Sequence, residues 1–274
     1  MAATSVREAL DSAVVALTAA GVDTPRLDAE VLLAHALGVD RAALLVDRDR
    51  AVEGSAVRAF QTAVRRRAFD REPVAYITGV KGFRHLDLHV DRRVLIPRPE
   101  TETLVEAVVE ILPQGARVHD LGTGSGAVAL ALKDERPDLV VSASDVSKEA
   151  LAVARANAER LGLDVEFTHT DLLAGIRGVD AVVSNPPYVE DGAELAPEIV
   201  RHEPSLALRA GPEGLDVLRL LVPAAAALGA KMLAVEVGAG QAEAVQELAA
   251  AAGFTASGRH ADLAGIDRVV VAWR

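Results

Sequence analysis

The residues Asn185-Pro186-Pro187-Tyr188 bring together groups that can hold a planar –NH2 group. The two prolines fix the backbone and carry no N–H, which leaves carbonyl oxygens free to accept hydrogen bonds. Asn185 adds a side-chain carbonyl acceptor, and Tyr188 adds an aromatic face with a polar tip. We expect all four residues to bind an amide or exocyclic amine, which can then be methylated, with Asn185, Pro186 and Tyr188 as the catalytic residues.

A second loop, Gly122-Thr123-Gly124-Ser125-Gly126, follows an apolar run and precedes a helical pattern. Glycines let the backbone turn sharply and approach a ligand closely, and a helix N-terminus offers free N–H groups. The loop indicates a nucleotide site. Taken alone, it also fits a tight turn without a ligand, and with Ala127 it satisfies a loose dinucleotide fingerprint.

Three carboxylates stand at predicted strand ends and extend this nucleotide site. Asp145 lies about twenty residues beyond the glycine loop, where a carboxylate can accept both ribose hydroxyls. We expect Asp171 to accept from an adenine amino group and Asp120 to orient the amino-acid end of a methyl donor. An Asp at a strand end is also a common helix cap, and the spacing suits NAD and S-adenosylmethionine equally.

The elements that position these residues alternate along the chain from residue 100 onward. Strands are predicted at 116–121, 138–145, 164–169, 180–184, 231–237 and 267–273, with helices near 101–111, 126–135, 147–161, 215–228 and 240–252. This rhythm predicts an α/β fold with a doubly wound, mostly parallel sheet, whose last strand is inserted antiparallel. Ligands bind outside the carboxyl ends of such strands. We therefore expect the glycine loop, the carboxylates and the loop Asn185–Tyr188, called the proline loop below, to converge there.

The first part of the chain has a different pattern. Residues 5–20, 26–37 and 53–70 show the apolar spacing of helices and predict a small helical domain. Residues 74–90, which include Tyr76-Ile77-Thr78, alternate around two glycines and predict a β-hairpin. We place the domain boundary near residue 72.

Composition excludes several classes of protein. The 274 residues contain no cysteine, which rules out disulfides and thiolate chemistry, and the seven histidines show no metal-ligand spacing. We find no signal pattern and no apolar stretch of the roughly 18–20 residues that span a bilayer, so we expect a cytoplasmic protein without a membrane partner. The net charge of −11 argues against a protein that grips phosphates.

Basic residues nevertheless gather in one segment. Residues 58–98 hold ten Lys/Arg against four Asp/Glu, a local excess of 10 − 4 = +6. A solvated helix face and linker would explain this excess. The alternative is an electrostatic guide for an acidic or RNA-associated partner.

With these residues in view, the chain resembles class I S-adenosylmethionine-dependent methyltransferases, and among them the HemK/PrmC family. The resemblance spans nearly the whole chain and is carried by Asn185–Tyr188 and by the segments 72–79, 95–102, 201–204 and 262–268. It implies a seven-stranded, mostly parallel sheet with an antiparallel last strand. It also implies a helical substrate-docking domain (1–72), a β-hairpin linker (73–99) and a methyltransferase domain (100–274).

Members of that family methylate the side-chain amide nitrogen (N5) of the glutamine in the Gly-Gly-Gln motif of class I peptide chain release factors. The resemblance implies that Gly122–Gly126 hold the methionine part of S-adenosylmethionine beside Asn185, and that Asp145 holds its ribose. Leu172 would lie against the adenine, where some members have an aromatic side chain. Asn185–Tyr188 would receive the glutamine. The implied partner is a release factor, with no direct nucleic acid contact, and we expect a monomer.

Other functions compete with this one. An adenine-N6 DNA methyltransferase uses the same tetrapeptide, but the acidic charge and the 3% aromatic content disfavour it. A glutamine methyltransferase acting on another protein fits the same motifs. An NAD-dependent oxidoreductase would explain the glycine loop and Asp145 but leaves Asn185–Tyr188 unused, and the chain has no Tyr-x-x-x-Lys pair. A non-catalytic nucleotide-binding module is a weaker alternative.

Overall fold

The computed structural model describes residues 4–274, which divide into two units. The smaller unit contains the residues up to Gly79 together with Leu195–His202, and the larger unit contains Val80–Glu194 and Glu203–Arg274. The division therefore lies at Gly79 and not near residue 72, because the short helix that precedes Gly79 packs on the helices of the smaller unit.

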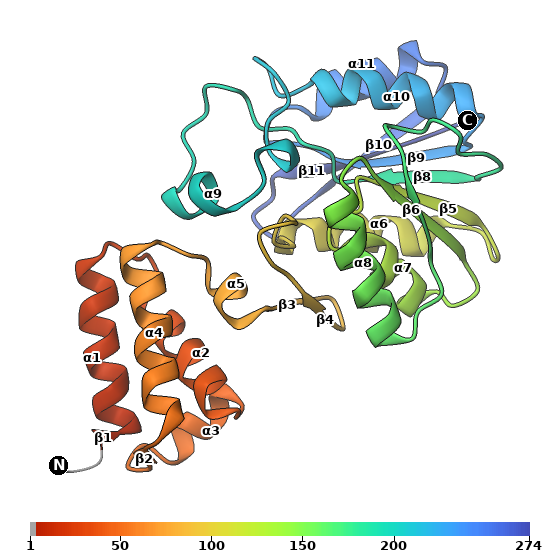
Figure 1. Ribbon diagram of the computed structural model, residues 1–274. Coiled ribbons are helices and arrows are strands. Elements are labelled where there is room, and N and C mark those ends of the chain that lie inside the picture. The colour runs from red at the N-terminus through yellow and green to blue at the C-terminus, as the bar shows by residue number, and fades with distance from the viewer. Residues whose placement is uncertain (1–3) are drawn as a thin grey trace. The chain divides into compact units, whose positions relative to one another are not determined.

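The smaller unit is helical, as Figure 1 shows. Its elements are α1 (Val6–Ala19), α2 (Pro25–Leu37), α3 (Arg41–Val46), α4 (Ser55–Phe69), α5 (Val74–Thr78) and α9 (Pro197–His202), with short strands β1 (Thr4–Ser5) and β2 (Ala51–Val52). The apolar faces of α1, α2 and α4 meet in one core around Leu17, Leu33 and Phe60. The three helices expected from the apolar spacing are confirmed, whereas α3 and α9 were not anticipated.

The prediction of a strand at Tyr76-Ile77-Thr78 is wrong, because these residues belong to α5. Pro73 stands at the N-cap, Gly79 adopts the left-handed conformation at the C-cap, and the Thr78 hydroxyl donates to the Val74 carbonyl over 3.1 Å. The hairpin begins only at Val80 and consists of β3 (Val80–Phe83) and β4 (Leu86–His89). Local capping thus overrides the alternating pattern.

The larger unit is built on a seven-stranded sheet in the order β10-β11-β9-β8-β5-β6-β7. The strands are β5 (Arg117–Leu121), β6 (Val140–Asp145), β7 (Glu166–His169), β8 (Ala181–Ser184), β9 (Met232–Glu236), β10 (Ala256–Ala261) and β11 (Asp267–Trp273). The neighbours from β9 to β7 pair in parallel, and β11 pairs antiparallel with both β9 and β10. The predicted fold class is confirmed, including the antiparallel insertion of the last strand.

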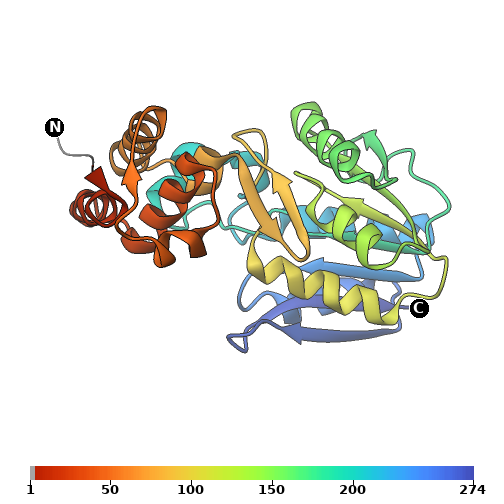
Figure 2. The ribbon, with the colours of Figure 1, turned by 90° about the horizontal axis from the view of Figure 1, so that it is seen from below.

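Helices cover both faces of this sheet (Figures 1 and 2). One face packs on α6 (Glu102–Ile111), α7 (Ala127–Glu135) and α8 (Lys148–Leu161), and the other on α10 (Asp216–Leu228) and α11 (Ala242–Ala251). The central strand β8 is buried along its whole length, which explains its uninterrupted apolar sequence. Two 3-10 turns, η1 (Pro99–Thr101) and η2 (Ser205–Ala207), complete the unit. Within residues 4–274, no helix is both long and apolar enough to cross a bilayer.

Candidate active site

The carboxyl ends of the parallel strands place the candidate residues along one edge of the sheet. Because β5, β6, β7, β8 and β9 pair in parallel, the residues that follow each strand emerge on the same side. The glycine loop follows β5, Asp145 ends β6, Asn185 follows β8 and Glu236 ends β9. The sheet therefore brings the glycine loop and the loop Asn185–Tyr188 to one edge.

Neighbouring strand ends hold the glycine loop open. The N–H groups of Gly122 and Thr123 donate to the Ser144 carbonyl over 2.8 and 3.0 Å, and that of Gly124 donates to Asp145 Oδ2 over 2.9 Å. Gly122 and Gly124 have φ of 71° and 56°, and a Cβ at either position would meet no atom within 4 Å. Both glycines thus provide a left-handed turn with an open side for a ligand.

Gly126 has a different role, because it is the N-cap of α7. A Cβ at this position would lie 2.9 Å from Leu130 Cδ1 and 3.4 Å from Ala154 Cβ. The φ of 87° and the close approach of Leu130, a residue of α7 itself, favour glycine here. A contact between Gly126 and the methyl donor stays a prediction.

A cavity of about 50 Å³ connects the glycine loop with the proline loop. It is lined by Leu95, Pro97, Thr101, Asp120, Gly122, Thr123, Gly124, Ser125, Ala127, Val128 and Asn185. This volume accepts the end of a ligand rather than a whole nucleoside, and Asp145, Asp171 and Leu172 are not among its lining residues. The structure therefore brings Asp120, most of the glycine loop and Asn185 together around one small space.

Asp120 is fully buried beside this cavity. Its Oδ2 accepts from the Thr123 hydroxyl over 2.7 Å and from the Ala129 N–H over 3.2 Å. Burial raises the pKa of Asp120 to about 7, against the opposing effect of these two hydrogen bonds. A cation placed in the cavity would favour the charged form of this carboxylate.

Asp145 is half-buried and partly engaged. Its Oδ2 accepts from Gly124, and its Oδ1 accepts from the Ser147 N–H over 2.8 Å. A carboxylate has about four acceptor sites. Its remaining capacity is what a ribose diol would need.

Leu172 lies in a strained turn after β7. Its φ of 47° is unusual for a leucine, and the turn is closed by the Ala174 N–H donating to the Asp171 carbonyl over 3.2 Å. The Leu172 side chain packs against the core under α10 and α11, and Asp171 is exposed. Their contacts with an adenine stay predictions.

The two ends of the proline loop are tied to neighbouring elements. Asn185 Nδ2 donates to Thr101 Oγ1 over 2.9 Å, and the Tyr188 hydroxyl donates to Glu236 Oε1 over 3.0 Å. Within the described residues, no donor engages Asn185 Oδ1 or the Pro186 carbonyl oxygen. Two acceptors are thus left open, one on Asn185, which lines the cavity, and one on the residue that follows it.

Gln241 supports the proline loop from the side of β9. Its Oε1 accepts from the Gly238 N–H over 2.8 Å, and its Nε2 donates to the carbonyls of Tyr188 and Glu213 over 3.1 and 3.2 Å. Sequence reasoning singled out neither Gln241 nor Thr101 as a site residue, and it left Glu236 without a role. The family segment 95–102 was the only signal that could have pointed to Thr101.

Burial raises the pKa of both Tyr188 and Glu236, which share a hydrogen bond at the end of the proline loop. It raises the pKa of Tyr188, and the neighbouring Glu236 carboxylate raises it further, so the hydroxyl stays protonated and donates. Burial also raises the pKa of Glu236, while the hydroxyls of Thr101 and Tyr188 and the charge of Arg268 lower it. The charge state of Glu236 therefore depends on these two hydroxyls.

Two further family segments meet at Glu203, which is buried. Its Oε2 accepts from the Ile96 N–H over 3.1 Å, and its Oε1 accepts from Arg98 Nη2 over 2.5 Å. Arg98 thereby holds the chain that leads into η1. Glu102 Oε1 accepts from the Arg84 N–H over 3.1 Å, which fixes the hairpin turn.

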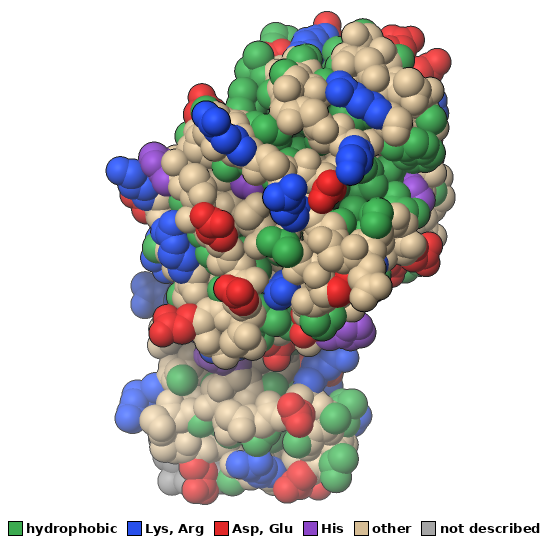
Figure 3. Space-filling model, turned by 90° about the vertical axis from the view of Figure 1, so that its right-hand side faces the viewer, with side chains coloured by type: hydrophobic (Ala, Val, Ile, Leu, Met, Phe, Trp, Pro, Cys, Tyr) green, Lys and Arg blue, Asp and Glu red, His purple; other side chains and the backbone are tan. Residues whose placement is uncertain are grey.

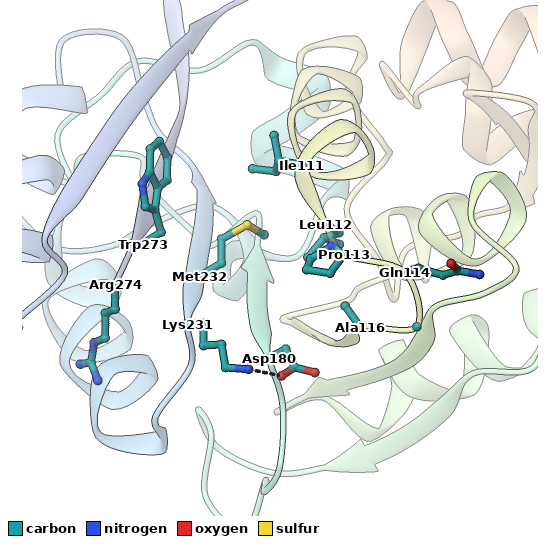
Figure 4. Close-up of a pocket in the computed structure, with 11 residues that line it drawn as sticks. Ile111, Leu112, Pro113, Gln114, Ala116, Asp180, Lys231, Met232, Trp273 and Arg274 are labelled. Atoms are coloured by element: carbon teal, nitrogen blue, oxygen red, sulfur yellow. Dashed lines mark hydrogen bonds and ion pairs between the residues drawn. The ribbon is translucent and has the colours of Figure 1, made fainter.

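A larger cavity of about 540 Å³ lies at the opposite, amino-terminal edge of the sheet (Figure 4). Its lining includes Ala116, Asp180 and Lys231, which directly precede β5, β8 and β9, together with Met232 and Trp273. Lys231 Nζ pairs with Asp180 Oδ1 over 3.2 Å. This cavity contains none of the candidate site residues, so size alone does not identify the active site. Across residues 4–274, no cluster of three His, Asp or Glu side chains could hold a metal ion.

A doubly wound, mostly parallel sheet with an antiparallel last strand and helices on both faces is the architecture of class I methyltransferases. Residues 99–242 match the family described as "Methyltransferase small domain", and residues 8–79 match "PrmC N-terminal domain". A solved methyltransferase from Pyrococcus furiosus shares the fold, with a TM-score of 0.51 at 18% identity over 69% of this chain and 88% of that one.

Curated relatives narrow the class. The chain is 44% identical to the release factor glutamine methyltransferase of Moorella thermoacetica, over 98% of its own length and 99% of that protein. It is 47% identical to the one of Mycolicibacterium smegmatis, over 81% of its own length and 80% of that protein. The chain belongs to the HemK/PrmC family of release factor glutamine methyltransferases.

Proposed function

We propose that this protein transfers a methyl group from S-adenosylmethionine to the side-chain amide nitrogen of the glutamine in the Gly-Gly-Gln motif of class I release factors. One observation carries the proposal: within residues 4–274 no donor engages Asn185 Oδ1 or the Pro186 carbonyl oxygen, and Asn185 lines the cavity that the glycine loop also lines. The names of the curated relatives support the same substrate.

The residues present fit the methyl donor. Gly122 and Gly124 leave the cavity side of their loop open, Asp120 offers a buried carboxylate to the donor's ammonium group, and Asp145 has acceptor capacity left for a ribose. When bound, S-adenosylmethionine supplies a methyl carbon that a nitrogen can attack in line as the carbon–sulfur bond breaks. Leu172 and Asp171 are proposed to face the adenine.

The chain's own residues must activate an amide, whose nitrogen lone pair is delocalised into the carbonyl. We propose that Asn185 Oδ1 and the Pro186 carbonyl oxygen each accept one N–H of the glutamine amide, which pins the nitrogen with its lone pair toward the donor. Positive charge grows on this nitrogen during transfer, and the two oxygens and the Tyr188 ring stabilise it. The methylated amide is acidic and loses its proton to water, so a strong general base is unnecessary.

We propose that the smaller unit docks the body of the release factor. The basic excess in residues 58–98 lends little support to electrostatic guidance, because most of these side chains are already paired. At least six of the ten Lys/Arg are paired: Arg66–Glu72, Arg67–Asp28, Arg71–Glu198, Arg84–Glu135, Arg93–Asp91 and Arg98–Glu203. On the face shown in Figure 3, acidic and basic side chains are interspersed. Action as a monomer without direct nucleic acid contact stays part of the proposal.

The proposal is tested by following labelled methyl groups from S-adenosylmethionine into three acceptors: a class I release factor, a release factor whose motif reads Gly-Gly-Ala, and duplex DNA. We expect label in the first acceptor alone. Label in DNA would favour the adenine-N6 alternative. Label in both release factors would show that the methylated residue is not the glutamine of the motif.

A further inference from the structure

The orientation of one amide decides whether the proposed reaction works. An asparagine side chain presents an oxygen on one side and an –NH2 group of similar shape on the other. In the proposed reaction the oxygen of Asn185 accepts from the glutamine –NH2 group. In the other orientation the Asn185 –NH2 group would face the glutamine –NH2 group, and two donors cannot form a hydrogen bond with each other. The chain therefore needs a device that holds Asn185 in one of its two orientations.

Thr101 is the first part of this device. It ends η1, is 3% exposed and receives the Asn185 Nδ2–H at Oγ1 over 2.9 Å. A hydroxyl has a single hydrogen and two lone pairs, so it can either donate to an asparagine oxygen or accept from an asparagine –NH2 group. Where the Thr101 hydrogen goes thus sets which end of the Asn185 amide faces it.

Glu236 is the second part. It is fully buried at the end of β9 and, when ionised, can only accept hydrogen bonds. The Tyr188 hydroxyl donates to its Oε1 over 3.0 Å, and the neighbouring Thr101 hydroxyl lowers the pKa of this carboxyl. Among the described residues, the buried Oε2 of Glu236 has no hydrogen-bond partner, so it is available to accept from a hydroxyl beside it. An ionised Glu236 can therefore accept from the Tyr188 hydroxyl at Oε1 and from a second hydroxyl at Oε2.

We propose that Thr101 and Glu236 are positioning residues that orient the Asn185 amide for catalysis. The Glu236 carboxylate takes the Thr101 hydrogen, a Thr101 lone pair takes an Asn185 N–H, and Asn185 Oδ1 is left facing the substrate. The same carboxylate fixes the Tyr188 ring at the other end of the loop. This inference rests on the proposed function and adds two residues to its machinery.

The arrangement depends on pH because protonation gives Glu236 an O–H donor and reduces its capacity to accept from the two hydroxyls. Thr101 and Tyr188 face this carboxyl with hydroxyls, Arg268 favours its charge, and Glu100 opposes it. Arg268 is itself held by Asp262 Oδ2 over 2.9 Å. Since burial moves the pKa of Glu236 upward, turnover should fall on acidification through that raised value.

The test compares Thr101→Val, which keeps the shape and removes the hydroxyl, with Thr101→Ser, which keeps the hydroxyl. Thr101→Val should lower kcat on a release factor by about tenfold or more, the effect of one lost hydrogen bond at a buried site. It should also weaken the binding of a Gly-Gly-Gln peptide to the S-adenosylhomocysteine complex. Thr101→Ser should restore both to within about threefold.

Glu236→Gln provides an independent readout. Its amide offers N–H groups to Thr101, so kcat should drop and the acid limb of the kcat profile should disappear. If Thr101→Val melts well below the wild type, its kcat cannot be interpreted, and Glu236→Gln then tests the positioning role. A wild-type kcat in Thr101→Val, or an unchanged acid limb in Glu236→Gln, would overturn the positioning role of these residues. The proposed function would still stand as long as the wild type methylates the glutamine. A wild type that methylates no glutamine would overturn both.

Discussion

Asn185 and Thr101 are 84 residues apart in the chain, yet their side chains share a hydrogen bond of 2.9 Å. This bond joins the loop after β8 to the 3-10 turn before α6, two segments that both carry family motifs. It leaves Asn185 Oδ1 free next to the glycine loop. Asn185 Oδ1, the oxygen proposed to accept from the glutamine amide, is thus oriented by a partner from a distant part of the chain.

Replacing Tyr188 by Phe should affect stability as well as turnover. The change removes the hydroxyl that donates to the buried Glu236, and leaving a buried acceptor without its partner costs about 1–3 kcal/mol. Tyr188→Ala should reduce kcat further, because it also removes the ring face. Urea unfolding and steady-state kinetics of the two variants would check this. Equal kcat in Phe and Ala variants would contradict a role for the ring.

Gly214→Ala should distort the proline loop. Gly214 has a φ of 68°, and a Cβ there would lie 2.2 Å from the Tyr188 carbonyl oxygen. Gly115→Ala is the matched control, because Gly115 has a φ of 69° with no atom within 4 Å of its Cβ position. Backbone strain of about 1–2 kcal/mol is common to both variants, so only Gly214→Ala should lose most of its kcat. Equal kcat in the two variants would show that the close approach to Tyr188 is unimportant.

Asp120→Asn should change how stability depends on pH. Because the pKa of Asp120 rises from its ordinary value near 4 to about 7 on folding, the folded protein holds a proton in this window that the unfolded chain has lost. Wild-type stability conferred by this group is present below about pH 4 and is lost as pH rises through about 7.

The Asn side chain cannot ionise, so the advantage of Asp120→Asn over the wild type should grow between about pH 4 and 7 and then level off. His119, whose pKa burial lowers to about 4, has the opposite dependence, and comparing the two proteins cancels it. Urea unfolding at several pH values measures the difference. A constant difference across the window would refute the raised pKa of Asp120.

The docking proposal predicts an effect on the Michaelis constant for protein substrate alone. Phe69 in α4 is 78% exposed, and an exposed aromatic side chain is a candidate contact for a partner. Phe69→Ser should raise KM for an intact release factor and leave KM for a short Gly-Gly-Gln peptide unchanged. Val140→Ser, at the start of β6 and 58% exposed, is the control. A similar rise in KM for both substrates would count against docking by this surface.

Much of the fold could be predicted because the buried strands of the large sheet are rich in apolar residues and the longer helices show apolar residues at a spacing of three and four. The edge strand β10, Ala-Ser-Gly-Arg-His-Ala, was missed because it is largely exposed and has no apolar alternation. The helix α5 was missed because Pro73 and Gly79 cap residues whose own pattern alternates.

The candidate site could be predicted only where single loops carry it. The glycine loop and Asn185–Tyr188 are contiguous in sequence, so their chemistry is readable. Thr101, Glu236 and Gln241 act through hydrogen bonds to residues 84, 48 and 53 positions away, and no local pattern encodes those partners. Gly126 shows the converse, since its φ of 87° and its closeness to Leu130 give a structural reason for this glycine inside the loop motif.

The central claim is that Asn185 positions a glutamine amide for methylation, and peptide-level mass spectrometry tests it most directly. A class I release factor is incubated with S-adenosylmethionine and either the wild type or Asn185→Ala. The wild type should add one methyl group to the glutamine of the Gly-Gly-Gln motif. Asn185→Ala should be slower by about 10²–10³, the effect of losing one preorganised group at a developing charge. Methylation by Asn185→Ala at more than half the wild-type rate, or a methyl group on any other residue, would contradict the account.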